Sequence, residues 1–189
     1  MIIGLGHVAR SGKDTAAHAL VRDLGFERRA FADKLKQLAV AADPIVTTAT
    51  QATNVGSGKG RLNWVVRGMG LEQAKDVYPE VRRFLQDLGA GAREVFGDNF
   101  WIDMCLPEVE WVGSPLSDVV VSDVRYENEA DEIRRRGGKL IRINRPGMYA
   151  AGHETETALV DFDWDEEVDN DGSVQDLEQK IVKLVKGWT

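Results

Sequence analysis

The feature that most constrains the fold is a glycine-containing turn that lies between an apolar run and a helical pattern. Residues 1–5, MIIGL, have the character of a short buried strand. From Asp14 onward, apolar residues recur at the spacing of one helix face. The turn itself, residues 6–15, is GHVARSGKDT. Successive backbone N–H groups can point inward in such a turn, and the helix N-terminus adds partial positive charge, so the segment predicts a phosphate-binding loop.

The turn departs at two positions from the common phosphate-loop pattern G-x-x-x-x-G-K-[ST]. His7 lies five residues before Gly12, where the first glycine is expected, and Asp14 follows Lys13 where a Mg²⁺-binding hydroxyl is expected. A carboxylate also binds a hard cation, directly or through water, and Thr15 supplies a hydroxyl beside it. The alternative interpretation is a plain glycine turn before a helix. The residues expected to contact ATP are His7, Ala9, Arg10, Ser11, Gly12, Lys13, Asp14 and Thr15.

The order of the other elements favours a parallel sheet. A second strand is expected at residues 26–31 and a second helix as far as Pro44, so the chain begins with a βαβ unit. Consecutive valines at 119–121 predict a strand buried on both faces, and residues 140–143 predict another. These patterns predict an α/β P-loop NTPase fold of three layers, in which helices cover both faces of a parallel sheet. We expect residues 1–189 to form one domain.

Three further segments have distinct local patterns. Residues 44–61 are rich in Thr and Gly and lack an apolar period, which predicts an irregular functional segment. A helix is expected from Pro79 to Gly89. The last helix is expected to begin at Ser173, where Asp176 completes an approximate capping box.

Composition excludes several classes of protein. The formal net charge of −7 argues against nucleic acid as a partner, because such proteins usually carry a basic face. The single cysteine, Cys105, allows neither an internal disulfide nor a cysteine metal cluster and favours a cytoplasmic setting. The N-terminus lacks the features of a signal peptide, and no apolar run is long enough to span a bilayer, so no membrane partner is expected.

An acid and an arginine follow the valine-rich strand. Asp123 comes directly after residues 119–122 and could hold Mg²⁺ through water, as a Walker-B acid does. Arg125 lies two residues further and could reach a phosphate. Phosphoryl transfer needs such groups, because the enzyme mainly positions the reactants and stabilises spreading negative charge. The alternative is a surface Asp–Arg pair at a strand end.

Several segments together resemble the bacteriophage deoxynucleoside monophosphate kinases, relatives of adenylate kinase, and they occur in the order of that family. His7 departs from the better-known members. The matching segments are residues 10–15 (RSGKDT), 31–36 (FADKLK), 82–89 (RRFLQDLG), 96–101 (FGDNFW), 122–129 (SDVRYENE) and 170–173 (NDGS).

The resemblance implies an enzyme that uses ATP and Mg²⁺ to convert a nucleoside monophosphate to the diphosphate. It also implies a mobile acceptor-binding region, which residues 44–100 resemble, and a lid, which residues 145–157 resemble. Lid closure would exclude water and prevent wasteful ATP hydrolysis. A phage-encoded protein of this kind would act in the host cytoplasm. The base preference and the oligomeric state stay open, with a homodimer as one alternative.

The acceptor site is expected on two helices. Arg82 and Gln86 are four residues apart and share a helix face, where an arginine fork suits a phosphate and an amide suits a base edge. Asp33 and Lys36 follow the second strand, so they could contact the acceptor, although Asp33 could instead cap a helix. The alternative for Arg82 is a plain surface residue. Two further candidates are Arg93, as a phosphate ligand, and Trp101, which lines the pocket or belongs to the core.

Arginines also flank the expected lid. Arg142 and Arg145 lie where related kinases direct arginines at ATP, and Arg145 is the better candidate. The expected catalytic residues are therefore Lys13, Arg125 and Arg145, with Asp14 and Asp123 as metal ligands. Two other functions stay open: a P-loop kinase of another small acceptor, such as dephospho-coenzyme A or a sugar acid, and a non-catalytic nucleotide-binding protein.

Overall fold

The computed structural model describes the chain except for residues 7, 48–58, 107–116, 149–158, 160 and 189. The chain divides into two compact units. The first unit comprises Met1–Phe31 with Cys105–Thr189, and the second comprises Ala32–Met104.

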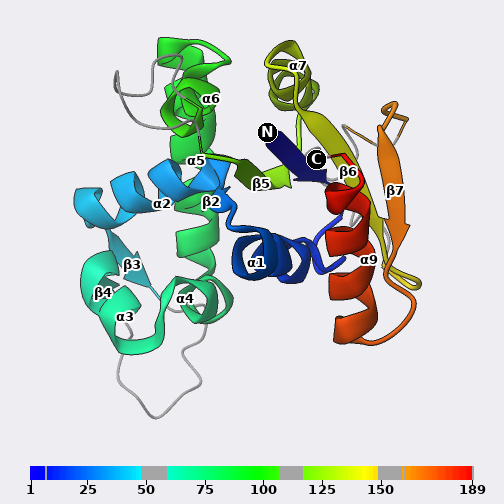
Figure 1. Ribbon diagram of the computed structural model, residues 1–189. Helices are drawn as coiled ribbons and strands as arrows, with labels where there is room; N and C mark the ends of the chain where they lie inside the picture. The colour runs from blue at the N-terminus through cyan, green and yellow to red at the C-terminus, as the bar shows by residue number, and fades with distance from the viewer. Residues whose placement is uncertain (7, 48–58, 107–116, 149–158, 160, 189) are drawn as a thin grey trace. The chain divides into compact units, whose positions relative to one another are not determined.

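The first unit is built on a parallel sheet. Its strands lie in the order β2-β5-β1-β6-β7, and each neighbouring pair is parallel (Figure 1). A parallel sheet needs strands that are apolar on both sides, and Val119, Val120 and Val121 supply such a strand between β2 and β1. The strands are β1 (Ile2–Gly6), β2 (Glu27–Arg29), β5 (Val119–Val124), β6 (Lys139–Asn144) and β7 (Glu166–Asp169).

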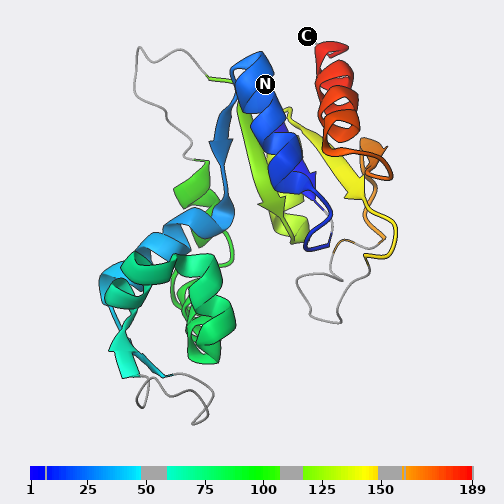
Figure 2. The same cartoon turned by 90° about the horizontal axis from the view of Figure 1, so that it is seen from below.

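Helices cover both faces of this sheet (Figure 2). Helices α1 (Lys13–Leu24) and α9 (Val174–Lys186) pack on one face, where Ile3 and Leu5 of β1 join their core. Helix α7 (Glu127–Arg135) covers the other face. The alternation along β1 explains its two glycines. A Cβ atom at Gly4 would lie 2.7 Å from Ile133 of α7, and one at Gly6 would overlap the ring of Trp164.

The second unit is mainly helical and has its own core. Its buried residues include Ala39, Leu62, Val65, Val81 and Leu85. The long helix α5 begins with Pro79, which suits a first helical position because its missing N–H would have no partner there. The elements are α2 (Phe31–Ala42), β3 (Ile45–Thr47), β4 (Lys59–Arg61), α3 (Leu62–Met69), α4 (Leu71–Val77), α5 (Pro79–Phe96) and α6 (Phe100–Cys105).

The α/β fold with a covered parallel sheet is confirmed, as is the capping box of Ser173 and Asp176 at the start of α9. The second strand is shorter than predicted, because Phe31 already begins α2. Residues 44–61 are not wholly irregular. Two short strands, β3 and β4, pair antiparallel near its ends, with Ile45 opposite Arg61.

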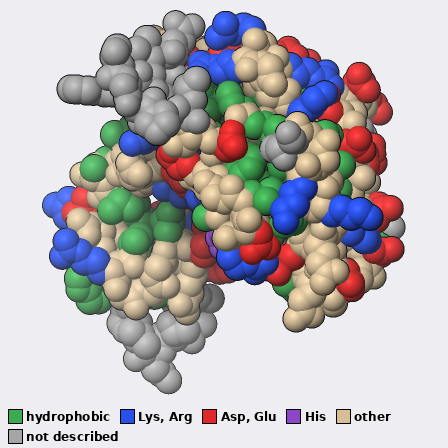
Figure 3. Space-filling view, viewed as in Figure 1, with side chains coloured by type: hydrophobic (Ala, Val, Ile, Leu, Met, Phe, Trp, Pro, Cys, Tyr) green, Lys and Arg blue, Asp and Glu red, His purple; other side chains and the backbone are tan. Residues whose placement is uncertain are grey.

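Helix α5 does not end at Gly89, contrary to the sequence-based prediction, but continues to Phe96. Gly89 is instead a packing glycine, because a Cβ atom there would lie only 3.2 Å from the Leu35 side chain. In the described part of the chain, no helix is long and apolar enough to cross a membrane. On the face of the first unit seen in Figure 3, basic and acidic side chains are interspersed.

Candidate phosphate-binding site

The loop between β1 and α1 has a special backbone. Gly12 precedes the helix with φ 110° and ψ 11°, a left-handed conformation that glycine adopts without steric cost. Arg10 is also left-handed, with φ 63°, which costs a non-glycine residue about 1–2 kcal/mol. Such strain persists where the surroundings enforce it and is concentrated at functional sites. Ser11, between the two, is fully buried.

Lys13 lies over this loop. Its Nζ atom donates to the carbonyl of Val8 at 2.6 Å and lies 3.5 Å from Ser11 Oγ. The ammonium group is thereby directed at the turn itself, at the positive end of the α1 dipole. Two sources of positive potential therefore meet at the loop, as the binding of nucleotide phosphates requires.

The sheet register brings three sequence-predicted residues to the same edge. Gly6 pairs with Val124 of β5 and with Arg142 of β6, so the carboxyl ends of these strands lie beside the loop. Asp123 and Arg125 flank Val124. Arg145 follows β6, and its Nη1 atom approaches the carbonyl of Arg10 at 3.4 Å. Arg142 instead lies 3.8 Å from Glu167 of β7.

The two predicted metal ligands differ in their surroundings. The Asp14 side chain is 76% exposed and lies 3.7 Å from the Arg28 guanidinium. Asp123 is half-buried, and its Oδ1 atom accepts the backbone N–H of Phe31 at 2.8 Å. The carboxylate that receives the first N–H of α2 is therefore Asp123, whereas Asp33, the alternative cap, lies within the first turn of that helix.

Two residues without a sequence-predicted role support the phosphate-binding loop and the carboxyl end of β5. Glu129 is only 7% exposed, and its Oε2 atom accepts the backbone N–H groups of Arg125 at 2.7 Å and Tyr126 at 3.1 Å. Burial, followed by the charge of Asp123, raises the pKa of Glu129 to about 8. Asn170, just beyond β7, donates from Nδ2 to the carbonyl of Ser11 at 2.8 Å. Both lie in segments that carry the family resemblance, but only the fold brings Asn170 to the loop.

Comparison with known proteins decides the family. Residues 65–181, more than half of the chain, match the model of the deoxynucleotide monophosphate kinases. The chain belongs to the deoxynucleotide monophosphate kinase family. As a member of this family it is a nucleotide kinase, and so a phosphotransferase.

Two viral relatives agree with this assignment. A protein of Acanthamoeba polyphaga mimivirus, provisionally named a deoxynucleotide monophosphate kinase, is 30% identical over 194 residues, covering 98% of this chain and 96% of its own. The deoxynucleotide monophosphate kinase of Enterobacteria phage T4 is 32% identical over 137 residues, covering 68% of this chain but only 56% of the phage protein. Among solved structures, shikimate kinase from Aquifex aeolicus aligns over 99% of this chain and 97% of its own, with a TM-score of 0.46 and 13% identity.

The second unit of this deoxynucleotide monophosphate kinase family member gathers two of the predicted acceptor-binding residues around acidic side chains of α4. Arg82 donates to Asp76 Oδ1 at 3.1 Å. Lys36 lies 3.9 Å from Glu72, which also pairs with Lys75 at 2.5 Å. Burial raises the pKa of Glu72, but the hydrogen bond from Lys75 and the charges of Lys75, Lys36 and Arg82 together outweigh it, so the pKa lies below its usual value. Lys36 and Arg82 therefore belong to one charged cluster.

The other predicted site residues are placed as follows. Gln86 is exposed on α5, and Arg93 is half-buried near the end of that helix. Trp101 belongs to the core: it is 8% exposed, and its indole N–H donates to the Gly89 carbonyl at 3.1 Å. Its contact with substrate stays a prediction. His7 and most of the predicted lid, residues 149–157, lie outside the described residues.

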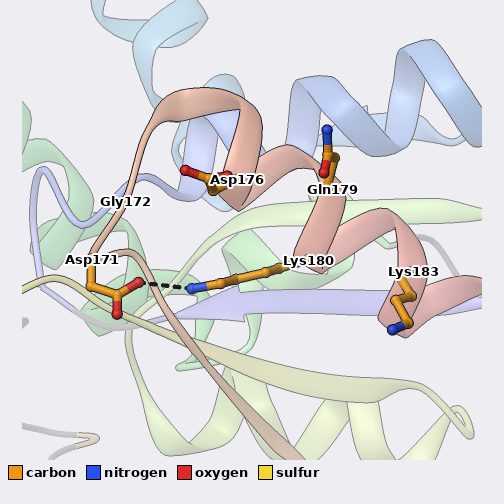
Figure 4. Close-up of a pocket in the computed structure, with 6 residues that line it drawn as sticks. All are labelled: Asp171, Gly172, Asp176, Gln179, Lys180 and Lys183. Atoms are coloured by element: carbon orange, nitrogen blue, oxygen red, sulfur yellow. Dashed lines mark hydrogen bonds and ion pairs between the residues drawn. The ribbon is translucent and has the colours of Figure 1, made fainter.

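A separate surface pocket of about 300 Å³ lies at the start of α9 (Figure 4). It is crossed by the ion pair between Lys180 and Asp171, 2.7 Å apart. None of the residues predicted to bind nucleotide lines it. The lining residues are Asp171, Gly172, Asp176, Gln179, Lys180 and Lys183.

Proposed function

We propose that this chain transfers the γ-phosphoryl group of Mg·ATP to a deoxynucleoside monophosphate, giving ADP and the deoxynucleoside diphosphate. The observation that carries the proposal is the position of Lys13, held over a strained loop at the N-terminus of α1 in a member of a nucleotide kinase family. The acceptor class follows from the family and from the name of the relatives.

The ATP side of the reaction belongs to the first unit. We assign the backbone N–H groups of the loop to the phosphates of ATP, with Lys13 on the β- and γ-phosphates. Lys13 would then exchange the Val8 carbonyl, its present partner, for phosphate oxygens. Arg145, beside Arg10, and Arg125, beside Asp123, would stabilise the charge that spreads over the transferring group.

The residues at this edge fit Mg²⁺. Asp14, Thr15 and Asp123 offer carboxylate and hydroxyl oxygens, which are the ligands that this cation prefers, and Asp14 is open to solvent. Among the described residues, no three His, Cys, Asp or Glu side chains gather into a metal cage. Mg²⁺ in kinases is commonly held by one or two carboxylates together with substrate phosphates, so Asp14 and Asp123 are sufficient candidates. When bound, the ion neutralises charge on the β- and γ-phosphate oxygens.

The acceptor side is assigned to the second unit. Arg82 and Lys36 would bind the acceptor phosphate, and Gln86, on the same face of α5 as Arg82, would contact the base. The carboxylates of Asp76 and Glu72 that now pair with the two cations are negatively charged, as a phosphate is. A phosphate dianion would take their place on Arg82 and Lys36.

A coupled assay of ADP release tests the proposal. The acceptors are the four common deoxynucleoside monophosphates, the corresponding ribonucleotides, dephospho-coenzyme A and a sugar acid. We expect release of ADP that depends on at least one deoxynucleotide. ATP binding without such release would indicate a non-catalytic protein, and a clear preference for a non-nucleotide acceptor would refute the assignment.

Lys13→Ala tests the mechanism in the same assay, with Lys183→Ala as its control. We expect an intact fold by circular dichroism and a fall in kcat of about 100-fold or more, because a preorganised charge at the transferring group is lost. Lys183→Ala removes an exposed lysine of α9 away from the loop and is expected to retain wild-type turnover. Wild-type turnover in folded Lys13→Ala would contradict the mechanism.

A further inference from the structure

The phosphate-binding loop is tied to a segment that lies 159 residues further along the chain. Asn170 donates from its side-chain amide to the carbonyl oxygen of Ser11 at 2.8 Å. Ser11 is fully buried, so this carbonyl needs a partner inside the protein. Asn170 supplies it from the turn that joins β7 to α9.

The contact determines how the next amide of the loop points. The carbonyl of Ser11 and the N–H of Gly12 belong to one peptide group, and the described residues contain no cis peptide bond. In a trans peptide these two bonds point in opposite directions. With the carbonyl directed at Asn170, the Gly12 N–H must point away from that turn. Asn170 therefore fixes the direction of one of the donors of the predicted phosphate cradle.

The turn that carries Asn170 is itself held on both sides. The backbone N–H of Asn170 donates to the carbonyl of Asn144 at 2.6 Å, at the end of β6. Lys180 of α9 donates to the carbonyl of Asp169 at 2.7 Å. It also donates to Asp171 Oδ1 at 2.7 Å (Figure 4). Lys180 thus contacts the residues before and after Asn170, so the Asn170 amide has little freedom to follow a displacement of the phosphate-binding loop.

Gly12 makes the close approach feasible. A Cβ atom at this position would lie 2.6 Å from Asn170 Nδ2 and 2.9 Å from the Leu177 side chain of α9. Both distances are too short for a real side chain. The glycine of the loop therefore serves two purposes: it allows the left-handed backbone, and it leaves room for the amide that holds Ser11.

We propose that Asn170 is a positioning residue of the phosphate-binding loop, which orients the Ser11–Gly12 peptide for the phosphates of ATP without contacting the nucleotide itself. The inference rests on the proposed use of the loop for ATP and adds a determinant of its affinity. It predicts that the donor character of the side chain matters, and not merely its size.

Asn170→Asp tests the donor character, because it keeps the size of the side chain but places a carboxylate oxygen against the Ser11 carbonyl. We expect the Kd and KM for ATP to rise about tenfold or more, which corresponds to leaving a buried polar group without its partner. The KM for the monophosphate should change less than about twofold. Gln179→Glu is the matched control, because it makes the same change from an amide to a carboxylate at an exposed position of α9, and ATP affinity should stay within about twofold of wild type.

Two further measurements separate positioning from a structural role. Asn170→Ala, which adds no charge, should also weaken ATP binding, and it replaces Asn170→Asp if that variant does not fold. In the wild type, the Gly12 amide resonance should shift strongly in an NMR titration with ATP, and the shift should be smaller in both variants. A variant that is less stable but binds ATP as tightly as wild type would overturn the proposal. If wild-type protein binds ATP but phosphorylates no deoxynucleotide, the proposed function fails while this test still stands.

Discussion

At the scale of single residues, Lys13 is already ordered before a nucleotide arrives. Its ammonium group is held by the Val8 carbonyl within its own loop. A free lysine side chain carries up to about 2 kcal/mol of rotamer entropy, which would otherwise be lost on binding. The loop therefore presents a preorganised charge, and exchange of one oxygen partner for another costs little. Preorganisation of this kind favours electrostatic stabilisation of the transition state.

Arg82 allows the acceptor assignment to be tested by a single substitution. Arg82→Ala should raise the KM for the monophosphate about 10- to 100-fold, because a charge-assisted contact to phosphate is lost, and should leave the Kd for ATP within about twofold. Initial rates at varied monophosphate, with ATP binding measured by calorimetry, check this. The neighbouring Arg83→Ala is the matched control and should resemble wild type. A defect confined to ATP would show that Arg82 does not bind the acceptor.

The residues that could be predicted from the sequence are those whose role follows from local spacing. Gly12 and Lys13 are fixed by their distance from a strand and a helix: Gly12 ends the turn after β1, and Lys13 is the first residue of α1. Asn170 could not be assigned in this way, because it meets Ser11 only after the sheet has formed. The ion-pair partner of Arg82 could not be predicted from the sequence either, because Asp76 lies on another helix, six residues away across a turn.

At the scale of elements, helix α7 carries two glutamates, Glu129 and Glu132, whose pKa values are shifted in opposite directions. Burial raises the pKa of Glu129 from 4.5 to about 8. The hydrogen bond from Arg135, reinforced by Arg136 against the effect of burial, lowers the pKa of Glu132 from 4.5 to about 2. The first group therefore opposes folding when it is ionised, and the second favours folding when it is ionised.

Substitution of each glutamate by glutamine should reveal the opposite pH dependence of their contributions to stability. The folded protein must ionise Glu129 at a higher pH than the unfolded chain, so wild-type stability should fall relative to Glu129→Gln as the pH rises from 4.5 to about 8. For Glu132 the order is reversed, so wild-type stability should fall relative to Glu132→Gln as the pH drops from 4.5 toward 2. Urea unfolding of the three proteins across this range measures both. Differences from wild type that do not vary with pH would exclude both shifts.

Elements with a clear apolar period could be predicted, and elements defined by pairing could not. Strand β7, EEVD, has one buried residue, Val168, and no apolar alternation, because it lies at the edge of the sheet. Strands β3 and β4 are three residues each and form by pairing with one another. Gly89 was predicted to end a helix because glycine is common at helix C-termini. The structure gives another reason for a glycine at this position, which is its tight packing against Leu35.

At the scale of the whole molecule, the predicted substrate contacts are divided between two hydrophobic cores. One core joins β1, α1 and α9 beneath the phosphate-binding loop. The other joins Ala39, Leu62 and Val81 in the second unit, which carries Lys36, Arg82 and Gln86. The family resemblance implied an acceptor-binding region at residues 44–100 within one domain, whereas the separate core of Ala32–Met104 is seen only from the contacts of the folded chain. Two separate cores imply that each unit can lose stability with limited effect on the other.

Leu62→Ala tests this independence. Leu62 is fully buried in the core of the second unit, so the substitution should cost that unit about 2–5 kcal/mol. Hydrogen exchange should rise in α3 and α4 but not in α1 or α9, and the KM for the monophosphate should rise while ATP still binds. Ile181→Ala, at an equally buried position in the core beneath the loop, should produce the converse pattern. If either substitution increased exchange in both units to the same extent, the chain would unfold as one cooperative body. The separate effects that we expect for Arg82 and Asn170 on the two substrates would then need a cause other than separate cores.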